Sequence, residues 1–305
     1  MGIGNYIKEI GRGKDGARAL NRAQAADLFG QVLDGAVTDL EIGAFCLAMR
    51  IKGETPQEMA GFLDATHARL HTFAPAGGAD QRPTIVIPSY NGARKLPVLT
   101  PLLALLLARE GLPVLIHGTA TESTRVFTSK VLEALEIPAQ AAIETIANGQ
   151  VLFAPTALLC PGLQRVLDVR RVVNLRNPAH SLVKLMTPVQ GKSLLVTSYT
   201  HPEYAISMAE TLALMGTSAL LLRGTEGEAV ADPRRAPRMQ AFVHGQMTDL
   251  QTYQEGSLTT LPDLPQGTDA STTAHYIRSV LEGAQPVPAP IALQVAHILH
   301  LASTL

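Results

Sequence analysis

The feature that most constrains the fold is a change in the spacing of apolar residues near residue 75. Up to about residue 70 they recur at helical spacing, whereas after the linker-like segment 75–78 they gather into short runs between helical stretches. The runs of strand length are 84–87, 113–117, 193–198 and 219–222. Strands that alternate with helices form a largely parallel sheet covered on both faces, so the sequence predicts a helical module followed by an α/β domain.

The helical module begins its helices at recognisable capping residues. Asn21, Thr38 and Thr55 are good N-caps, and Glu41 and Glu58 stand three residues after the two threonines, as a capping box requires. Apolar residues recur at helical spacing after each of these starts. The sequence therefore predicts helices joined by short turns.

The composition is that of a globular protein with room for about two domains, since 46% of the 305 residues are hydrophobic. The longest apolar stretch, 98–108, is too short to span a membrane, and the first residues resemble no targeting signal. We therefore expect a cytoplasmic protein with no membrane partner. Cys46 and Cys160 lie far apart without metal-ligand spacing, which indicates buried, reduced thiols.

The charge is unevenly distributed although the net charge is only −1. Segment 163–192 carries six basic residues against Asp168, whereas segment 239–305 carries five acids against Arg278. The basic block could bind a polyanion, or it could be an ordinary solvated helix face. Charge alone leaves both interpretations open.

A parallel sheet binds ligands beyond the carboxyl ends of its strands, here the turns 88–95, 117–124, 198–203 and 223–232. A glycine-rich phosphate loop would be expected in the first turn, but residues 88–92 read Pro-Ser-Tyr-Asn-Gly. Arg94 and Lys95 follow. A pocket that grips phosphate through backbone N–H groups is therefore not predicted at this turn.

Several segments resemble the anthranilate phosphoribosyltransferase family, glycosyltransferase family 3. They are 33–35, 39–42, 48–61, 115–118, 131–135, 153–155, 169–171 and 277–283. The resemblance implies a nucleoside phosphorylase/phosphoribosyltransferase-like fold. It has a small helical domain, 1–72, completed by about 165–190, and an α/β domain, 73–164 and 191–305. It also implies a homodimer formed through the helical domains.

The family joins phosphoribosyl pyrophosphate to an aromatic amine with the help of magnesium, and this chain departs from its motifs. The family loop Gly-Thr-Gly-Gly-Asp is replaced at 88–92, and Lys-His-Gly-Asn-Arg becomes Ile-His-Gly-Thr-Ala at 116–120. Ala229 and Val230 stand where the resemblance places an Asp-Glu metal pair, and Glu226 and Glu228 are a less favoured substitute. We therefore expect absent or very low transferase activity, with no catalytic residue, metal or cofactor.

The chain is similar to a divergent branch of the family that keeps the fold and the dimer but binds DNA or RNA without sequence preference. Its candidate contacts to the nucleic-acid backbone are Arg94, Lys95, Arg165, Arg170, Arg171, Arg176, Lys184, Lys192, Arg234, Arg235 and Arg238. The cluster 234–238 is expected to be the most exposed. With aromatic residues at 4%, the sequence predicts no stacking platform for single strands.

A vestige of the anion pocket is also expected. Its candidate residues are Ser89, Asn91, Gly92, Thr100, His117, Gly118, Ser123 and Arg170. His117 could contact an anion, although a structural role at the strand end is favoured. The alternative function is that of a pentosyltransferase, a glycosyl- or phosphoribosyltransferase acting on an altered aromatic or nucleobase-like substrate at this pocket.

Overall fold

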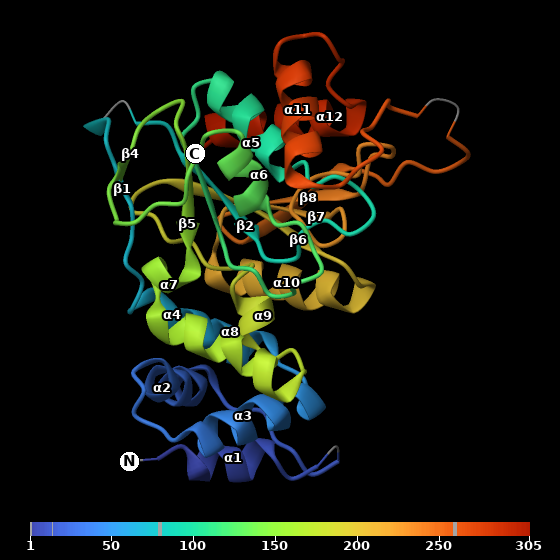
Figure 1. Cartoon of the computed structure of the whole chain (residues 1–305). Helices are drawn as coiled ribbons and strands as arrows, with labels where there is room; N and C mark the ends of the chain where they lie inside the picture. The colour runs from blue at the N-terminus through green and yellow to red at the C-terminus, as the bar shows by residue number, and fades with distance from the viewer. Residues whose placement is uncertain (1, 14, 79–80, 259–260) are drawn as a thin grey trace. The chain divides into compact units, whose positions relative to one another are not determined.

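The computed structural model describes residues 2–13, 15–78, 81–258 and 261–305. The chain forms two compact units, each built from two segments (Figure 1). The helical unit contains residues 1–71 and 156–188, and the α/β unit contains residues 72–155 and 189–305. Residues 156–164, which the sequence analysis placed in the α/β domain, group with the helical unit, because α7 (Thr156–Leu159) packs on α8 (Pro161–Val173).

The helical unit is held together by an aromatic cluster. Its helices are α1 (Gly4–Ile10), α2 (Arg22–Leu33), α3 (Asp39–Lys52), α4 (Pro56–His67), α7, α8 and α9 (Ala179–Leu182). Phe29, Phe45 and Phe62, from α2, α3 and α4, are fully buried, and the Phe29 and Phe62 ring centroids lie 4.9 Å apart. Such pairs add to the free energy gained by burying the rings themselves.

The expected helix starts are confirmed. Asn21, Thr38 and Thr55 are the N-caps of α2, α3 and α4, and each takes part in a reciprocal capping box. The box of α4 is buried: the Glu58 side chain has 0% exposure and accepts the backbone N–H groups of Thr55 and Leu20. The Lys52 ammonium lies 2.7 Å from the same carboxylate.

The α/β unit contains a mostly parallel sheet, as the sequence predicted. The strand order is β5-β3-β2-β6-β7-β8-β9, in which β5 through β7 are parallel and the last two pairings are antiparallel. The strands are β2 (Thr84–Ser89), β3 (Val114–Gly118), β5 (Val151–Pro155), β6 (Ser193–Tyr199), β7 (Ala219–Arg223), β8 (Met239–Val243) and β9 (Gln246–Gln251). A separate short pair joins β1 (Ala74–Pro75) to β4 (Thr145–Ile146).

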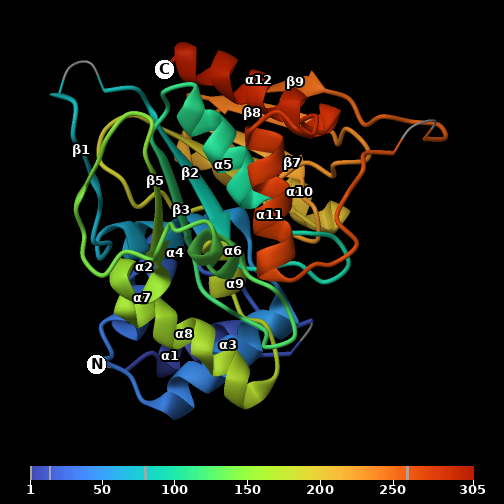
Figure 2. The same cartoon turned by 45° about the horizontal axis from the view of Figure 1, so that its top comes forward.

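Helices cover this sheet on both faces (Figures 1 and 2). One layer contains α5 (Thr100–Arg109), α6 (Thr128–Ala134), α11 (Ala270–Leu281) and α12 (Ala289–Ser303), which pack against one another. On the other face α10 (Pro202–Met215) packs against β6 and β7. The central strands β2 and β3 are buried at every position, as expected for a sheet covered on both sides.

Three strands of the seven-stranded sheet and the short pair of β1 and β4 were not predicted, and one helix was expected to start too early. β5, β8 and β9 were not predicted; β9 is largely exposed and polar, so it lacks the apolar run that marks a buried strand. The helix expected over 124–135 begins at Thr128, because Val126 pairs with Ala93 through two backbone hydrogen bonds and is held extended.

Two further expectations concern the membrane and the thiols. None of the helices in the described ranges combines the length and the apolar character needed to cross a lipid bilayer. Cys46 and Cys160 are buried and not joined in a disulfide, as predicted.

Candidate functional site

The carboxyl ends of β2, β3 and β7 bring three turns of the α/β unit together. Ser89 pairs in register with Gly118 at the ends of β2 and β3. The two strands approach so closely there that a Cβ on Gly118 would lie 1.9 Å from the Ser89 carbonyl oxygen. Only glycine fits this position. The expected meeting of turns 88–95, 117–124 and 223–232 at this edge is therefore observed.

The central group at this edge is the carboxylate of Glu228. It belongs to the turn after β7, it is only 1% exposed, and it accepts hydrogen bonds from the turn after β2 and from two helix N-termini. Its described donors are Asn91 N and Gly92 N to Oε1, both at 2.8 Å, and the hydroxyls of Ser89, Thr100 (3.2 Å) and Thr128 (3.4 Å) to Oε2. We call these five donors the oxyanion cradle.

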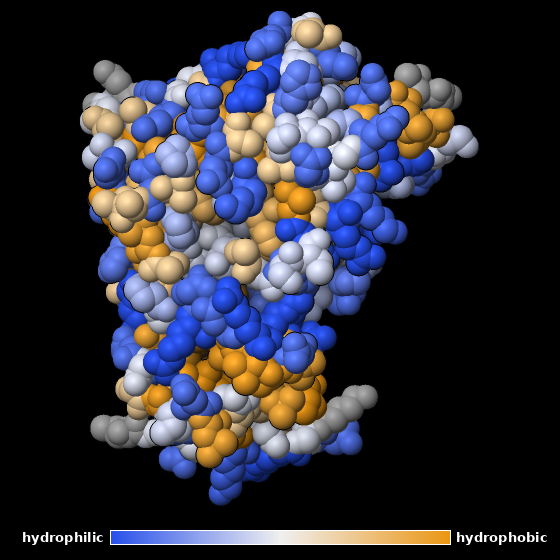
Figure 3. Space-filling model, viewed as in Figure 1, coloured by the Kyte–Doolittle hydropathy of each residue, from blue (hydrophilic) through white to orange (hydrophobic). Residues whose placement is uncertain are grey.

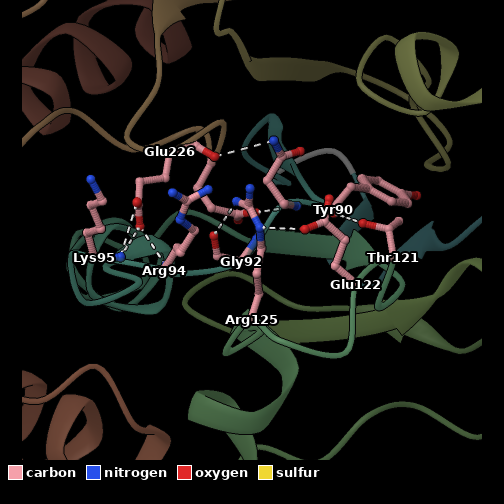
Figure 4. Close-up of polar contacts among 10 residues, drawn as sticks. Tyr90, Gly92, Arg94, Lys95, Thr121, Glu122, Arg125 and Glu226 are labelled. Carbon is pink, nitrogen blue, oxygen red and sulfur yellow. Dashed lines mark hydrogen bonds and ion pairs between the residues drawn. The ribbon is translucent and has the colours of Figure 1, made fainter. Parts of the chain in front are cut away.

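Glu226 makes a second, more exposed set of contacts with the same loop (Figure 4). Its carboxylate accepts the backbone N–H of Arg94 at 2.7 Å, of Lys95 at 3.0 Å and of Leu96 at 3.3 Å. Two carboxylates two residues apart thus accept hydrogen bonds from residues 91–92 and 94–96 of the β2–α5 loop. The sequence of this loop differs from the glycine-rich loop that the family resemblance implies, yet its backbone N–H groups still bind anions. These anions are the carboxylates of Glu226 and Glu228 of the same chain.

His117 has a structural role here. It is fully buried, and its Nδ1 lies 2.9 Å from the Tyr90 hydroxyl, with the two rings edge to face at a centroid distance of 5.7 Å. Thr121 holds the same turn by donating its hydroxyl to the Tyr90 carbonyl oxygen at 2.8 Å. The bulky Tyr90 is thereby buried and fixed between the ends of β2 and β3.

The predicted pocket is only partly assembled. Ser89, Asn91, Gly92 and Thr100 converge on one point, but Ser123 is exposed in the turn after β3 and makes none of the described contacts with Glu228. Arg170 belongs to α8 of the helical unit. Glu228 and Thr128 were absent from the predicted pocket.

The site does not fit the magnesium ion that the family resemblance implies. Ala229 and Val230 are buried and apolar, and the carboxylates of Glu226 and Glu228 accept hydrogen bonds from N–H and O–H donors of the protein, whereas magnesium prefers carboxylate oxygens that are free to coordinate it. Within the described ranges no group of three His, Cys, Asp or Glu side chains is arranged to hold a metal. The contacts of Glu226 and Glu228 thus give no support to the less favoured suggestion that these two residues replace the metal pair.

The candidate phosphate contacts of the α/β unit differ in availability. Arg94 and Lys95 are exposed, and neither side chain has a hydrogen bond or ion pair with any described residue. Lys192 is also exposed but directly precedes β6, so it lies at the amino edge of the sheet, opposite to these two. The predicted set is thus divided between two edges.

The cluster 234–238, expected to be the most exposed, is held by acidic and carbonyl partners. Arg234 donates two hydrogen bonds to Asp232, and Arg238 donates two to Asp249. Arg235 donates to the Gln254 carbonyl oxygen and stacks on Tyr253 with a centroid distance of 5.6 Å. Arg234 and Arg238 are exposed and Arg235 is half-buried, but the charges of these three side chains are already largely compensated.

The remaining candidates lie in the helical unit, on α8 and just beyond it. Arg165 and Arg171 are exposed on α8; Arg171 forms an i,i+3 ion pair with Asp168 at 3.1 Å, and Arg165 lies 4.0 Å from Asp39. Arg176 is exposed in the following loop, while Arg170 and Lys184 are half-buried. The basic block is therefore a partly solvated helix face, consistent with either interpretation of its charge.

Comparison with known proteins places this chain in a family. Residues 5–69 match the helical bundle domain of a glycosyl transferase family. Over 288 residues the chain is 30% identical to an anthranilate phosphoribosyltransferase of Sinorhizobium medicae, covering 90% of this chain and 82% of that protein. The chain belongs to the anthranilate phosphoribosyltransferase family.

Other relatives extend the comparison. The chain is 41% identical over 304 residues to the uncharacterized protein YbiB of Escherichia coli, covering 97% of this chain and 93% of that one. The anthranilate phosphoribosyltransferase of Thermus thermophilus shares its fold, with a TM-score of 0.72 at 22% identity over 95% of this chain and 85% of that one. The Saccharomyces cerevisiae enzyme gives a TM-score of 0.71 at 14% identity, covering 99% and 89% of the two chains. In this member of the anthranilate phosphoribosyltransferase family, the backbone N–H groups of Asn91 and Gly92 are bound by the carboxylate of Glu228.

Proposed function

We propose that this chain binds nucleic acid without sequence preference, through contacts between its basic side chains and the phosphate backbone. The observation that carries the proposal is the exposure of the Arg94 and Lys95 side chains. Both side chains are exposed and without a partner among the described residues, while Glu226 holds their backbone N–H groups. A fixed backbone presenting unpaired cations suits phosphate contacts, which supply affinity but do not read the base sequence.

Two further observations support this proposal. Arg223 ends β7 at the same edge of the sheet as Arg94 and Lys95, and its side chain is exposed. In the helical unit, α8 carries exposed Arg165 and Arg171. The alternative, pentosyl transfer to an altered substrate, has weaker support, because Glu228 occupies the donors that a substrate phosphate would need.

The test is binding of labelled DNA and RNA oligonucleotides of unrelated sequence, measured by fluorescence anisotropy between about 50 and 200 mM salt. We expect similar affinities for all sequences and a steep loss of affinity with salt. The double variant Arg94→Ala/Lys95→Ala should bind more weakly and reduce the salt slope by about 2. If nothing binds at the lowest salt, the proposal is wrong.

The matched control is Arg234→Ala/Arg238→Ala, which removes the same charge from cations that are already paired with Asp232 and Asp249. It should weaken binding less than the Arg94→Ala/Lys95→Ala variant. An equal effect of the two variants would show that only net charge matters and would contradict a specific role for Arg94 and Lys95. Binding of phosphoribosyl pyrophosphate with magnesium, measured by calorimetry, would favour the transferase instead.

We further propose that the chain forms a homodimer through its helical unit. Leu40, Leu47 and Ile51 on α3 are 83%, 50% and 60% exposed, and their spacing of seven and four residues puts them on one face of the helix. Val172, near the end of α8, is 82% exposed. Figure 3 shows apolar residues gathered over α3 and α8. An apolar surface of this kind is typical of an interface, and a second copy is the partner that the family resemblance implies.

Sedimentation velocity tests the dimer. Leu47→Lys/Ile51→Lys should produce a monomer that remains folded, whereas Ile206→Lys, which changes a 64% exposed residue on α10, should leave a dimer intact. A wild-type chain that sediments as a monomer at high concentration would contradict the proposal.

A further inference from the structure

Glu228 is a carboxylate in the interior of the α/β unit without a cation beside it. It is 1% exposed, and no lysine, arginine or histidine among the described residues forms an ion pair with it. A buried carboxylate is costly unless its oxygens are fully hydrogen-bonded. The oxyanion cradle meets this need entirely with neutral donors.

The composition of the cradle is that of a binding site for an oxyanion. Adjacent backbone N–H groups, those of Asn91 and Gly92, point at one oxygen, and the hydroxyls of Ser89, Thr100 and Thr128 surround the other. Successive backbone N–H groups that converge on one point form an anion-binding nest, and charge-assisted hydrogen bonds of this kind are among the strongest in proteins. Nothing in this donor set distinguishes a side-chain carboxylate from a free phosphate or sulfate.

The turn that carries Glu228 is built to hold it in place. Gly227 has φ +95° and packs on Asn91, Gly224 packs on the Glu228 carbonyl and on Ser198, and Thr225 pairs with Glu228 through a backbone hydrogen bond of 2.9 Å. Glu226 fastens the same turn to the backbone of Arg94 to Leu96. The carboxylate is therefore positioned by several independent contacts.

We propose that the oxyanion cradle is a complete anion-binding site that this chain keeps occupied with its own Glu228 carboxylate. Glu228 acts as a tethered ligand, and a free tetrahedral oxyanion binds in the cradle only when this carboxylate is removed. The proposal concerns the interior of the α/β unit and stands whether or not nucleic acid binds the exposed cations.

The experiment compares two variants that both remove one negative charge. Glu228→Ala empties the cradle, whereas Glu228→Gln keeps a side chain of the same size in it. Binding of inorganic phosphate is followed by the backbone amide signals of Asn91 and Gly92 in two-dimensional NMR spectra, at ionic strength held constant with chloride. We expect saturable shifts of both amides in Glu228→Ala, with at least tenfold tighter phosphate binding than in the wild type or Glu228→Gln.

Three results would overturn the proposal. They are a folded Glu228→Ala variant whose Asn91 and Gly92 amides do not respond to phosphate, a wild-type chain that responds equally, and equal binding by the Gln variant. If Glu228→Ala does not fold in chloride, it is refolded in phosphate or sulfate at the same ionic strength. Recovery of the folded state only with the oxyanions supports the proposal, because a ligand that binds only the native state stabilises it by mass action. Failure of the oxyanions to restore folding contradicts it.

Discussion

Gly227 lies against the side chain of Asn91 so closely that a Cβ on Gly227 would be 2.0 Å from the Asn91 amide nitrogen. The two residues come from turns that follow different strands, so their contact fixes how the Glu228 turn sits on the β2–α5 loop. Since the φ of Gly227 is also +95°, any larger residue meets both a clash and an unfavourable backbone conformation.

Gly227→Ala should therefore destabilise the protein both through the unfavourable positive φ and through the clash with Asn91. Gly283 is the matched control, because its φ of +81° is also positive but a Cβ there would meet nothing within 4 Å. We expect Gly227→Ala to cost about 2 kcal/mol more than Gly283→Ala in the free energy of unfolding, measured in urea. Equal losses would mean that the turn moves away from Asn91 at little cost.

The buried capping box of α4 gives a second prediction. Removing the Glu58 carboxylate leaves the N–H of Leu20 without its acceptor and leaves Lys52, which has a side-chain exposure of 9%, with only the Gly53 carbonyl oxygen. Glu58→Ala should cost about 3–5 kcal/mol in the free energy of unfolding, as expected when one member of a buried ion pair is lost. Glu133→Ala, which removes an exposed i,i+3 partner of Lys130, should cause little change. A small effect at Glu58 would show that water replaces its carboxylate.

His67 should make the stability of the protein depend on pH. Burial lowers the pKa of His67 below its usual value of 6.5, although the nearby Asp64 opposes the shift, and the neutral ring accepts the Thr187 N–H through Nε2. The unfolded chain binds a proton on His67 more readily than the folded chain does. The stability that neutral His67 contributes is therefore fully present above about pH 6.5 and is lost as the pH falls toward the pKa of the folded state. Urea unfolding at several pH values should show a smaller decrease on acidification in His67→Gln. Parallel curves for the two proteins would contradict this role.

The two thiols should be inert in the folded protein. Burial raises the pKa of Cys46 to about 12, although a hydrogen bond with Asn177 opposes the shift, and burial also raises the pKa of Cys160. Because the thiolate is the reactive form, neither residue should react with a chromogenic disulfide reagent at mildly alkaline pH until the chain is unfolded. Rapid labelling of native protein would show that the helical unit opens locally.

The sequence predicted best those features that arise between near neighbours. The pairs Thr38–Glu41 and Thr55–Glu58 are three residues apart, and both formed the expected capping boxes. The role of Glu228 could not be predicted in this way, because its partner Asn91 is 137 residues away and meets it only through the order of β2, β6 and β7.

Arg234, whose ion pair was not predicted, is a different case. Its partner Asp232 is only two residues away, so the sequence did contain the signal that this cation is paired. The bidentate contact of Arg238 with Asp249 depends instead on the register between β8 and β9, where Asp249 pairs with Gln240 next to an irregularity between Met239 and Gln240. The acidic residues near a basic cluster thus predict its availability for phosphate better than its exposure does.

The group that occupies the oxyanion cradle also determines whether the stability of the protein depends on the concentration of a metabolite. A site filled by a diffusing metabolite makes the stability of its protein rise and fall with the concentration of that metabolite. Glu228 is covalently part of the chain, so its free energy of binding is always included in the free energy of folding. This scaffold should therefore keep the same melting temperature whether phosphate metabolites are scarce or abundant.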